Sequence, residues 1–174
     1  MSAAPILIAE DNPSDAILLV RMIEGAKILN PLKILPDGQQ VIDYLQATSA
    51  YIGCPPWPAL LLLDLLMPTP GTKVLQWLKD KGLNQNLATV VLTDKVNYQE
   101  IRSAYSLGAN SFLTKQVTHV DFMNMLRGST FLRQEMTDAG IIVSHSRGAP
   151  SGRGEQTFCR PADSNQGSPD GKTS

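Results

Sequence analysis

Four short apolar runs along the chain each lead directly into ionisable or hydroxyl side chains. The runs and the residues that follow them are Pro5–Ala9 with Glu10 and Asp11, Ala59–Leu63 with Asp64, Thr89–Leu92 with Thr93, and Ser111–Thr114 with Lys115. Short apolar runs without polar alternation are typical of strands buried on both faces of a parallel sheet. The pattern therefore predicts four core strands whose carboxyl ends carry polar chemistry.

Helical spacing of apolar residues alternates with these strands, and 32–35 adds a short fifth strand. Helices are expected from Pro13 towards Gly25, around 41–45, around 74–78, from about Asn97 to Leu107, and from Thr118 to near Arg133. Asn12 is suited to cap the first helix, and Thr118 with Asp121 resembles a capping box. Five alternations of strand and helix predict an α/β fold, with a parallel sheet covered by helices on both faces.

The composition changes towards the C-terminus. From about Ser144 the chain is rich in Gly, Pro, Ser, Asp and Arg, and apolar residues almost vanish. Such a segment buries too little apolar surface to offset its ordering entropy. We expect one domain over residues 1–133 and an extension over 134–174 that is disordered from about 144. A chain ending near Gly140 should then melt at nearly the same temperature as the full chain.

Charge and composition exclude several function classes. The 174 residues carry 15 basic and 16 acidic side chains, a net charge of −1, without a basic stripe for nucleic acid or a membrane surface. No apolar stretch reaches the roughly 18 residues of a membrane span, and the N-terminus does not resemble a secretory signal. Cys54 and Cys159 are expected to be reduced thiols. A cytoplasmic protein is the simplest interpretation.

The residues at the strand ends define the candidate chemistry. Because ligands bind outside the carboxyl ends of parallel strands, the fold would gather these side chains at one edge. Glu10 and Asp11 alone are equally consistent with a solvated turn, but Asp64 adds a third carboxylate at the same edge. A hard cation such as Mg²⁺ relieves their repulsion. Lys115 suits a phosphoryl oxygen, although a simple salt bridge to an acid is the alternative, and Thr93 supplies one donor.

These residues, in this order, resemble the receiver domain of two-component response regulators. The resemblance covers about residues 4 to 133, and it implies a flavodoxin-like five-stranded parallel sheet. It is carried by Glu10-Asp11, Asp64 in Leu-Leu-Asp-Leu-Leu-Met-Pro, Thr93 in Val-Val-Leu-Thr, and Lys115 in Gly-Ala-Asn-Ser-Phe-Leu-Thr-Lys. The opening Ile-Ala-Glu-Asp-Asn-Pro-Ser-Asp also resembles the small regulators that serve bacterial phytochrome kinases.

The resemblance implies a role for each residue of the site. Asp64 would be the phosphoacceptor, taking a phosphoryl group from a phosphohistidine. Asp11, Asp64 and the backbone carbonyl of Leu66 would bind Mg²⁺, with Glu10 acting directly or through water. Lys115 and the metal would neutralise the phosphoryl oxygens, as phosphoryl transfer requires.

The resemblance also implies a switch and a phosphoryl lifetime. Thr93 would bond the acquired phosphoryl group, and Phe112 would turn inward as Thr93 moves, although Phe112 is equally suited to the core. In the family, the positions two residues after the phosphoacceptor and the threonine flank the hydrolytic water. They are Leu66 and Lys95 here, which cannot polarise a water and so predict slow hydrolysis. Asp94, where a small residue is usual, opposes this.

We interpret the chain as a single-domain regulator that catalyses only its own phosphorylation and signals through protein partners. The partner would be a sensor histidine kinase, such as a bacterial phytochrome, or a phosphotransfer protein. A Mg²⁺-dependent aspartyl phosphatase and a phosphorylation-independent binding module are the alternatives. A homodimer could form through the fourth helix, fifth strand and fifth helix. Its apolar residues, which could equally face the core, are Tyr98, Tyr105, Phe122, Met123, Met125 and Phe131.

Overall fold

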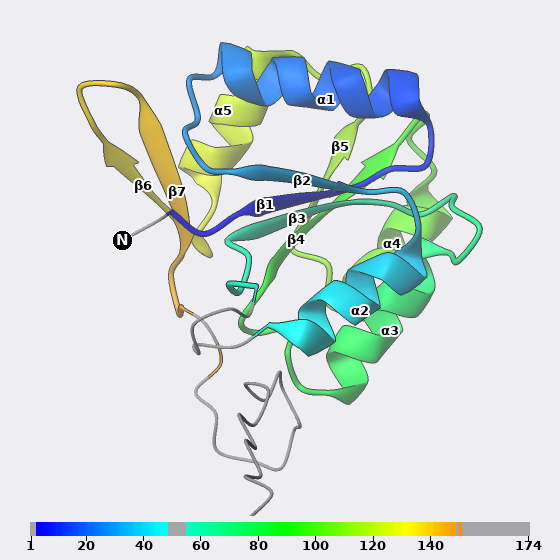
Figure 1. The fold of residues 1–174 in the computed structure, drawn as a ribbon. Coiled ribbons are helices and arrows are strands. Elements are labelled where there is room, and N and C mark those ends of the chain that lie inside the picture. Colours follow the sequence, from blue (N-terminus) through cyan, green and yellow to red (C-terminus); the bar gives the residue numbers. More distant parts are fainter. Residues whose placement is uncertain (1–2, 49–54, 149, 151–174) are drawn as a thin grey trace, which may run out of the picture.

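A five-stranded parallel sheet with the strand order β2-β1-β3-β4-β5 forms the centre of the molecule. The computed structural model describes residues 3–48, 55–148 and 150. Its elements are β1 (Ile6–Ala9), α1 (Pro13–Gly25), β2 (Leu32–Leu35), α2 (Gly38–Ala47), β3 (Leu60–Asp64), α3 (Gly71–Asp80), β4 (Ala88–Thr93), α4 (Tyr98–Ser106), β5 (Ser111–Thr114), α5 (His119–Gly128), β6 (Leu132–Met136) and β7 (Ile141–His145). Helices α1 and α5 cover one face of the sheet, and α2, α3 and α4 cover the other (Figure 1).

The two faces of the sheet build two separate apolar clusters. Alternate residues of the central strands point to opposite faces, so Ile6 and Ile8 pack with α1 and α5, whereas Leu7 and Ala9 pack with α2 and α3. Strands β1 and β3 are buried along their whole length, as the unbroken apolar runs predict. The α/β fold expected from the sequence is therefore confirmed.

The helix starts expected from the sequence are also present. The Asn12 side chain accepts hydrogen bonds from the N–H groups of Ser14 and Asp15 at the start of α1. Thr118 and Asp121 form a reciprocal capping box at the start of α5. These caps satisfy backbone donors that a helix leaves free in its first turn.

The chain after α5 differs from the expectation. Helix α5 ends at Gly128 instead of near Arg133, and β6 and β7 follow as an antiparallel hairpin. The expected domain limit at residue 133 falls inside β6. Because Ile141 and Val143 of β7 are buried in the cluster of α1 and α5, a chain ending near Gly140 would lose core residues. We therefore expect such a chain to be less stable than the full chain, contrary to what the composition suggested.

The hairpin lies at the amino ends of the sheet strands, beside the N-terminus (Figure 1). Asn30, in the loop between α1 and β2, fixes it there. The Asn30 amide nitrogen donates to the carbonyls of Ala4 and Val143, both at 2.7 Å, and its oxygen accepts from the Val143 N–H at 2.8 Å. The loop also exchanges backbone bonds with Ile141. We refer to these three side-chain bonds as the Asn30 clamp.

Some expectations fall outside the described residues. They concern the reduced state of Cys54 and Cys159 and the disorder expected after residue 144, most of which lies outside these residues. In the expected dimer surface, Phe122 and Met123 are buried in the core, whereas Tyr98 and Tyr105 are exposed. That surface is therefore smaller than the sequence suggested. Among the described helices, none has the length and apolar character needed to cross a membrane.

Candidate functional site

The carboxyl ends of the sheet strands meet at one edge, as the sequence predicts. Parallel pairing sets Ala9 beside Leu63 and Thr93 beside Thr114, so the residues that end or follow these strands are neighbours. The side chains gathered at this edge are Glu10, Asp11, Asp64, Thr93 and Lys115.

Asp64 is the buried centre of this site, and both of its oxygens have partners. Its Oδ1 accepts a hydrogen bond from the Leu66 N–H at 2.9 Å, and its Oδ2 accepts one from the Lys115 ammonium at 2.8 Å. Only 3% of Asp64 is exposed. At Gly71, which begins α3, a Cβ atom would collide with the Asp64 carbonyl oxygen, so only glycine allows this close approach. The position of Asp64 is therefore set by its backbone as well as by its charge.

The loop after β3 is held from a second side by the start of α2. The Asp37 carboxylate accepts hydrogen bonds from the N–H groups of Thr69, at 2.6 Å, and Gln39, at 3.1 Å. The Thr69 bond is the main reason that the pKa of Asp37 is lowered from its usual value. A Cβ atom at Gly38 would collide with the Thr69 carbonyl oxygen. The start of α2 thus supports the loop that follows Asp64.

Lys115 makes ion pairs with three carboxylates. Its Nζ lies 2.8 Å from Asp64 Oδ2, 2.9 Å from Glu10 Oε2 and 3.3 Å from Asp15 Oδ2. Burial alone would lower the pKa of Lys115, but the hydrogen bond to Asp64 and the negative charges of Asp64 and Glu10 outweigh it and raise that pKa. Lys115 therefore remains an ammonium. The sequence did not indicate Asp15, because an acid in the first turn of a helix is explained by the helix dipole alone.

In the described part of the chain, one carboxylate oxygen of Glu10 is buried without a hydrogen bond. Its Oε1 accepts from the Asn12 N–H, but Oε2 faces Lys115 without the geometry of a hydrogen bond and has no other partner among the described residues. Burial raises the pKa of Glu10, although Lys115 and Asn12 oppose that shift. Both facts describe a carboxylate whose charge lacks full compensation.

The three acids predicted from the strand ends do form a cluster. One carboxylate oxygen each from Glu10, Asp11 and Asp64 lies within 4.8 Å of the others, and Asp11 is exposed on the outer side. Hard oxygen donors, one of them buried without a hydrogen bond, are a suitable set for a divalent cation. The residues present therefore fit a metal that is open to solvent on one side.

Among the described residues, the side chains of Thr93 and Phe112 form no hydrogen bond with the Asp64 carboxylate. The Thr93 hydroxyl donates to the Lys95 carbonyl, within the loop after β4. Phe112 is partly buried and meets the Tyr105 ring edge-on, with 6.5 Å between the ring centroids. Lys95 is exposed, as is Leu66, which is 72% exposed next to Asp64.

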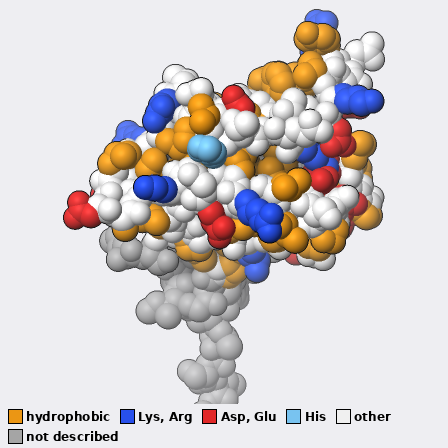
Figure 2. Space-filling view, turned by 90° about the horizontal axis from the view of Figure 1, so that it is seen from above, with side chains coloured by type: hydrophobic (Ala, Val, Ile, Leu, Met, Phe, Trp, Pro, Cys, Tyr) orange, Lys and Arg blue, Asp and Glu red, His pale blue; other side chains and the backbone are white. Residues whose placement is uncertain are grey.

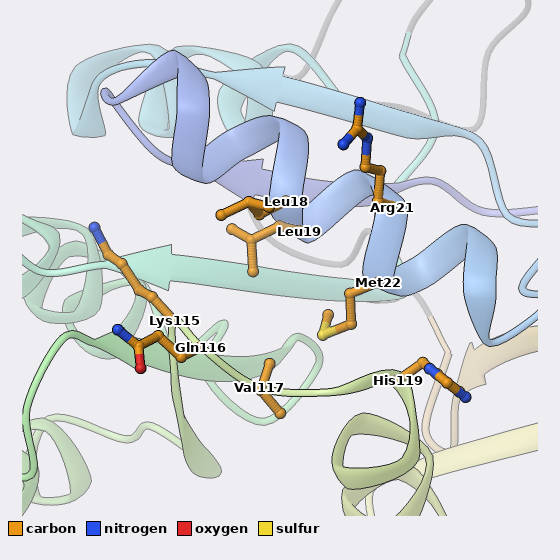
Figure 3. A pocket seen from close by; sticks show the side chains of 8 residues that line it. All are labelled: Leu18, Leu19, Arg21, Met22, Lys115, Gln116, Val117 and His119. Atoms are coloured by element: carbon orange, nitrogen blue, oxygen red, sulfur yellow. The ribbon is translucent and has the colours of Figure 1, made fainter.

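A pocket of about 400 Å³ opens beside Lys115. Figure 3 shows Leu18, Leu19 and Met22 of α1 facing Val117 across it. The wider α1–α5 face mixes apolar side chains with side chains of both charges (Figure 2). Leu18 is 55% exposed here. An apolar surface therefore borders the charged site.

Known proteins share this sequence pattern and this fold. The model of the response regulator receiver domain family matches residues 6–127. Response regulator Rcp1 of Synechocystis sp. is 33% identical over 71% of this chain and 84% of its own length. Its Mn(2+)-bound structure has a TM-score of 0.57 at 33% identity, covering 72% of this chain and 90% of that one.

Two further solved structures are similar. The bacteriophytochrome response regulator AtBRR has a TM-score of 0.63 and 33% identity, covering 73% of this chain and 92% of that one. The phosphorylated cyanobacterial phytochrome response regulator RcpA has a TM-score of 0.59 and 26% identity, covering 73% of this chain and 91% of that one.

Proposed function

Because the chain belongs to the family of response regulator receiver domains, we propose that Asp64 is its phosphoacceptor. The observation that carries this assignment is the position of the buried Asp64 carboxylate, which lies 2.8 Å from the Lys115 ammonium. Because the pKa of Lys115 is raised, this ammonium stays charged near pH 7. A phosphoryl group attached to Asp64 would lie within reach of that ammonium. The similar regulator RcpA was solved in a phosphorylated form, which supports the same chemistry here.

The acidic cluster would hold Mg²⁺. Glu10, Asp11 and Asp64 supply carboxylate oxygens, and the Leu66 backbone carbonyl is the fourth ligand that we assign from the family resemblance. The solved structure of Rcp1 in an Mn(2+)-bound form supports a divalent cation in this family. When bound, the cation neutralises charge on the oxygens of the transferring phosphoryl group.

The protein contributes position and charge to the transfer step. A bond forms between phosphorus and an Asp64 oxygen, the P–N bond of a phosphohistidine breaks, and its electron pair stays on the imidazole nitrogen. The Leu66 N–H orients the Asp64 carboxylate, and the Lys115 ammonium neutralises a phosphoryl oxygen. These are the contributions that phosphoryl transfer asks of a protein.

Phosphorylation would be read out through Thr93 and Phe112. The Thr93 hydroxyl now bonds to the loop carbonyl of Lys95, so it has to leave that bond to donate to a phosphoryl oxygen. Such a move changes the loop after β4 and frees space towards which Phe112 can turn. The exposed Tyr98 and the half-exposed Tyr105 lie on α4, next to this region, and form the remaining candidate surface for a homodimer through α4, β5 and α5.

The phosphoryl donor would be a cytoplasmic sensor histidine kinase or a phosphotransfer protein. A bacterial phytochrome is the kinase we favour, because AtBRR and RcpA are described as phytochrome response regulators. A helix carrying the phosphohistidine would approach over the apolar residues of α1, of which Leu18 borders the pocket beside Lys115. This contact would bring the phosphohistidine to Asp64.

Incubation with acetyl phosphate and Mg²⁺, followed by intact-mass analysis, tests the proposal. We expect one phosphoryl adduct on the wild type and none on Asp64→Asn. Asp11→Asn should weaken both Mg²⁺ binding and phosphorylation. Sustained turnover of small phosphate esters would instead favour a phosphatase, and absence of any adduct on the folded wild type would favour a phosphorylation-independent binding module.

A further inference from the structure

Asp15 is the carboxylate near Lys115 that stands apart from the acidic cluster. It comes from the first turn of α1, and its Oδ2 accepts a hydrogen bond from the Lys115 ammonium at 3.3 Å. The Asp15 side chain is 30% exposed, whereas the Lys115 side chain is only 9% exposed. A nearly buried ammonium has few water molecules available as hydrogen-bond partners. Each carboxylate near it therefore constrains its position.

The other two partners of Lys115 have competing roles in the proposed reaction. Asp64 becomes the phosphoryl carrier and shares the cation with Glu10, whose Oε2 is oriented poorly for a hydrogen bond to Lys115. When the cation is bound and Asp64 is phosphorylated, the contacts of both carboxylates with the Lys115 ammonium would therefore weaken. Asp15 lies outside this cluster, so among the described residues it is the ion-pair partner of Lys115 that keeps its contact.

We propose that Asp15 is a positioning residue for phosphoryl transfer. It holds the Lys115 ammonium over Asp64 while Glu10 and Asp64 are engaged, and it acts only through Lys115. This inference rests on the proposed phosphorylation of Asp64. It goes beyond the family resemblance, which assigns no role to this position.

The three roles that this ion pair could have predict different effects of its removal. A partly exposed ion pair without functional consequence contributes little, so its removal would leave phosphorylation unchanged. A competing anion would hold the ammonium away from the phosphoryl group, so its removal would accelerate phosphorylation. A positioning residue predicts slower phosphorylation, because a misplaced charge no longer stabilises the transferring group.

The experiment compares phosphorylation rates at saturating acetyl phosphate and Mg²⁺ for wild type, Asp15→Asn and Asp15→Glu. Glu24→Gln is the charge-matched control, since Glu24 is an exposed acid in the last turn of the same helix. We expect Asp15→Asn to be about tenfold slower than Glu24→Gln, and Asp15→Glu, which keeps the charge on a longer arm, to recover most of that loss. A loss below threefold, or any acceleration, would overturn the proposal.

A second readout separates this inference from the function on which it rests. In Mg²⁺-loaded, unphosphorylated protein, the NMR signal of the Lys115 ammonium reports how firmly Nζ is held. It should be sharp in wild type and Glu24→Gln, and broadened in Asp15→Asn. If the wild type takes no phosphoryl group, the proposed function fails, yet this signal still shows whether Asp15 positions Lys115. An unchanged signal in Asp15→Asn would show that Asp15 does not hold the ammonium.

Discussion

The Asn30 clamp offers the sharpest test of how the C-terminal hairpin is held. Replacing Asn30 by Ala removes three hydrogen bonds of 2.7 to 2.8 Å and leaves the N–H and carbonyl of Val143 without partners. Both groups of Val143 lie in a residue that is 0% exposed, whereas the Ala4 bond is only partly buried. A buried backbone group without a partner costs about 1–3 kcal/mol.

The expected loss follows from these contacts. Two buried groups at about 1.5 kcal/mol each give about 3 kcal/mol, and water can reach the Ala4 carbonyl, so its loss adds little. For a domain of this size that corresponds to a fall in melting temperature of about 10 °C. If the hairpin detaches in the variant, the denaturant slope should also decrease, because less surface is left to expose on unfolding.

Urea unfolding monitored by far-UV circular dichroism measures this loss. The matched control is Asn124→Ala, which makes the same substitution at an exposed position of α5 without a side-chain hydrogen bond in the described structure. Asn124→Ala should change the free energy of unfolding by less than about 0.5 kcal/mol. A difference below about 1 kcal/mol between the two variants would refute the clamp as the main attachment of the hairpin.

The remaining predictions concern the loops beside Asp64, the carboxylate of Asp37 and the C-terminal hairpin. Replacing Leu66 by Asn and Lys95 by Glu should shorten the phosphoryl lifetime on Asp64 at least several-fold in a phosphate-release assay. The reason is that the introduced side chains can orient and polarise a water. Loss of the wild-type phosphoryl group within seconds would contradict this reasoning. Asp37→Asn should destabilise the fold by about 1 kcal/mol near neutral pH and by almost nothing near about pH 2. The reason is that the pKa of Asp37 is lower in the folded state than its ordinary value of 3.8. The ionised side chain therefore stabilises the fold above that pH, and this stabilisation is lost as the pH falls through the folded-state pKa. Urea unfolding at both pH values gives the difference. A chain ending at Gly148 should melt within a few degrees of the full chain, whereas one ending at Gly140 should melt far lower because it lacks β7; equal melting of the two would contradict the packing of the hairpin.

The sequence predicted the sheet and most of the site because local chemistry and burial agree there. Strands β1 and β3 are buried on both faces, so their apolar runs are unbroken, and the position of a residue at a strand end determines where it lies in a parallel sheet. The family and the fold inferred from Glu10, Asp64 and Lys115 were therefore confirmed. The individual roles of these residues remain predictions.

Strand β6 was missed because its sequence carries little of this information, although β7 contains the apolar residues Ile141, Ile142 and Val143. Only Leu132 is buried in β6, so the strand lacks both an apolar run and regular alternation. The hairpin depends on Asn30, 113 residues from its partner Val143, and no local pattern connects the two. The same applies to Asp15, whose partner Lys115 lies 100 residues away. Contacts of this kind depend on tertiary structure and not on local propensity.

Helix α1 joins two places that have been described separately. Its first turn carries Asp15, which contacts Lys115, and its last turn leads into the loop that holds Asn30 and the hairpin. Thirteen residues at about 1.5 Å per residue make a rod of roughly 20 Å. Tilting such a rod by about 3° at one end displaces its other end by about 1 Å. A single helix therefore spans from the charged edge to the loop that holds the hairpin at the opposite end of the sheet, so a tilt of α1 would move both the Asp15 carboxylate and the loop of Asn30.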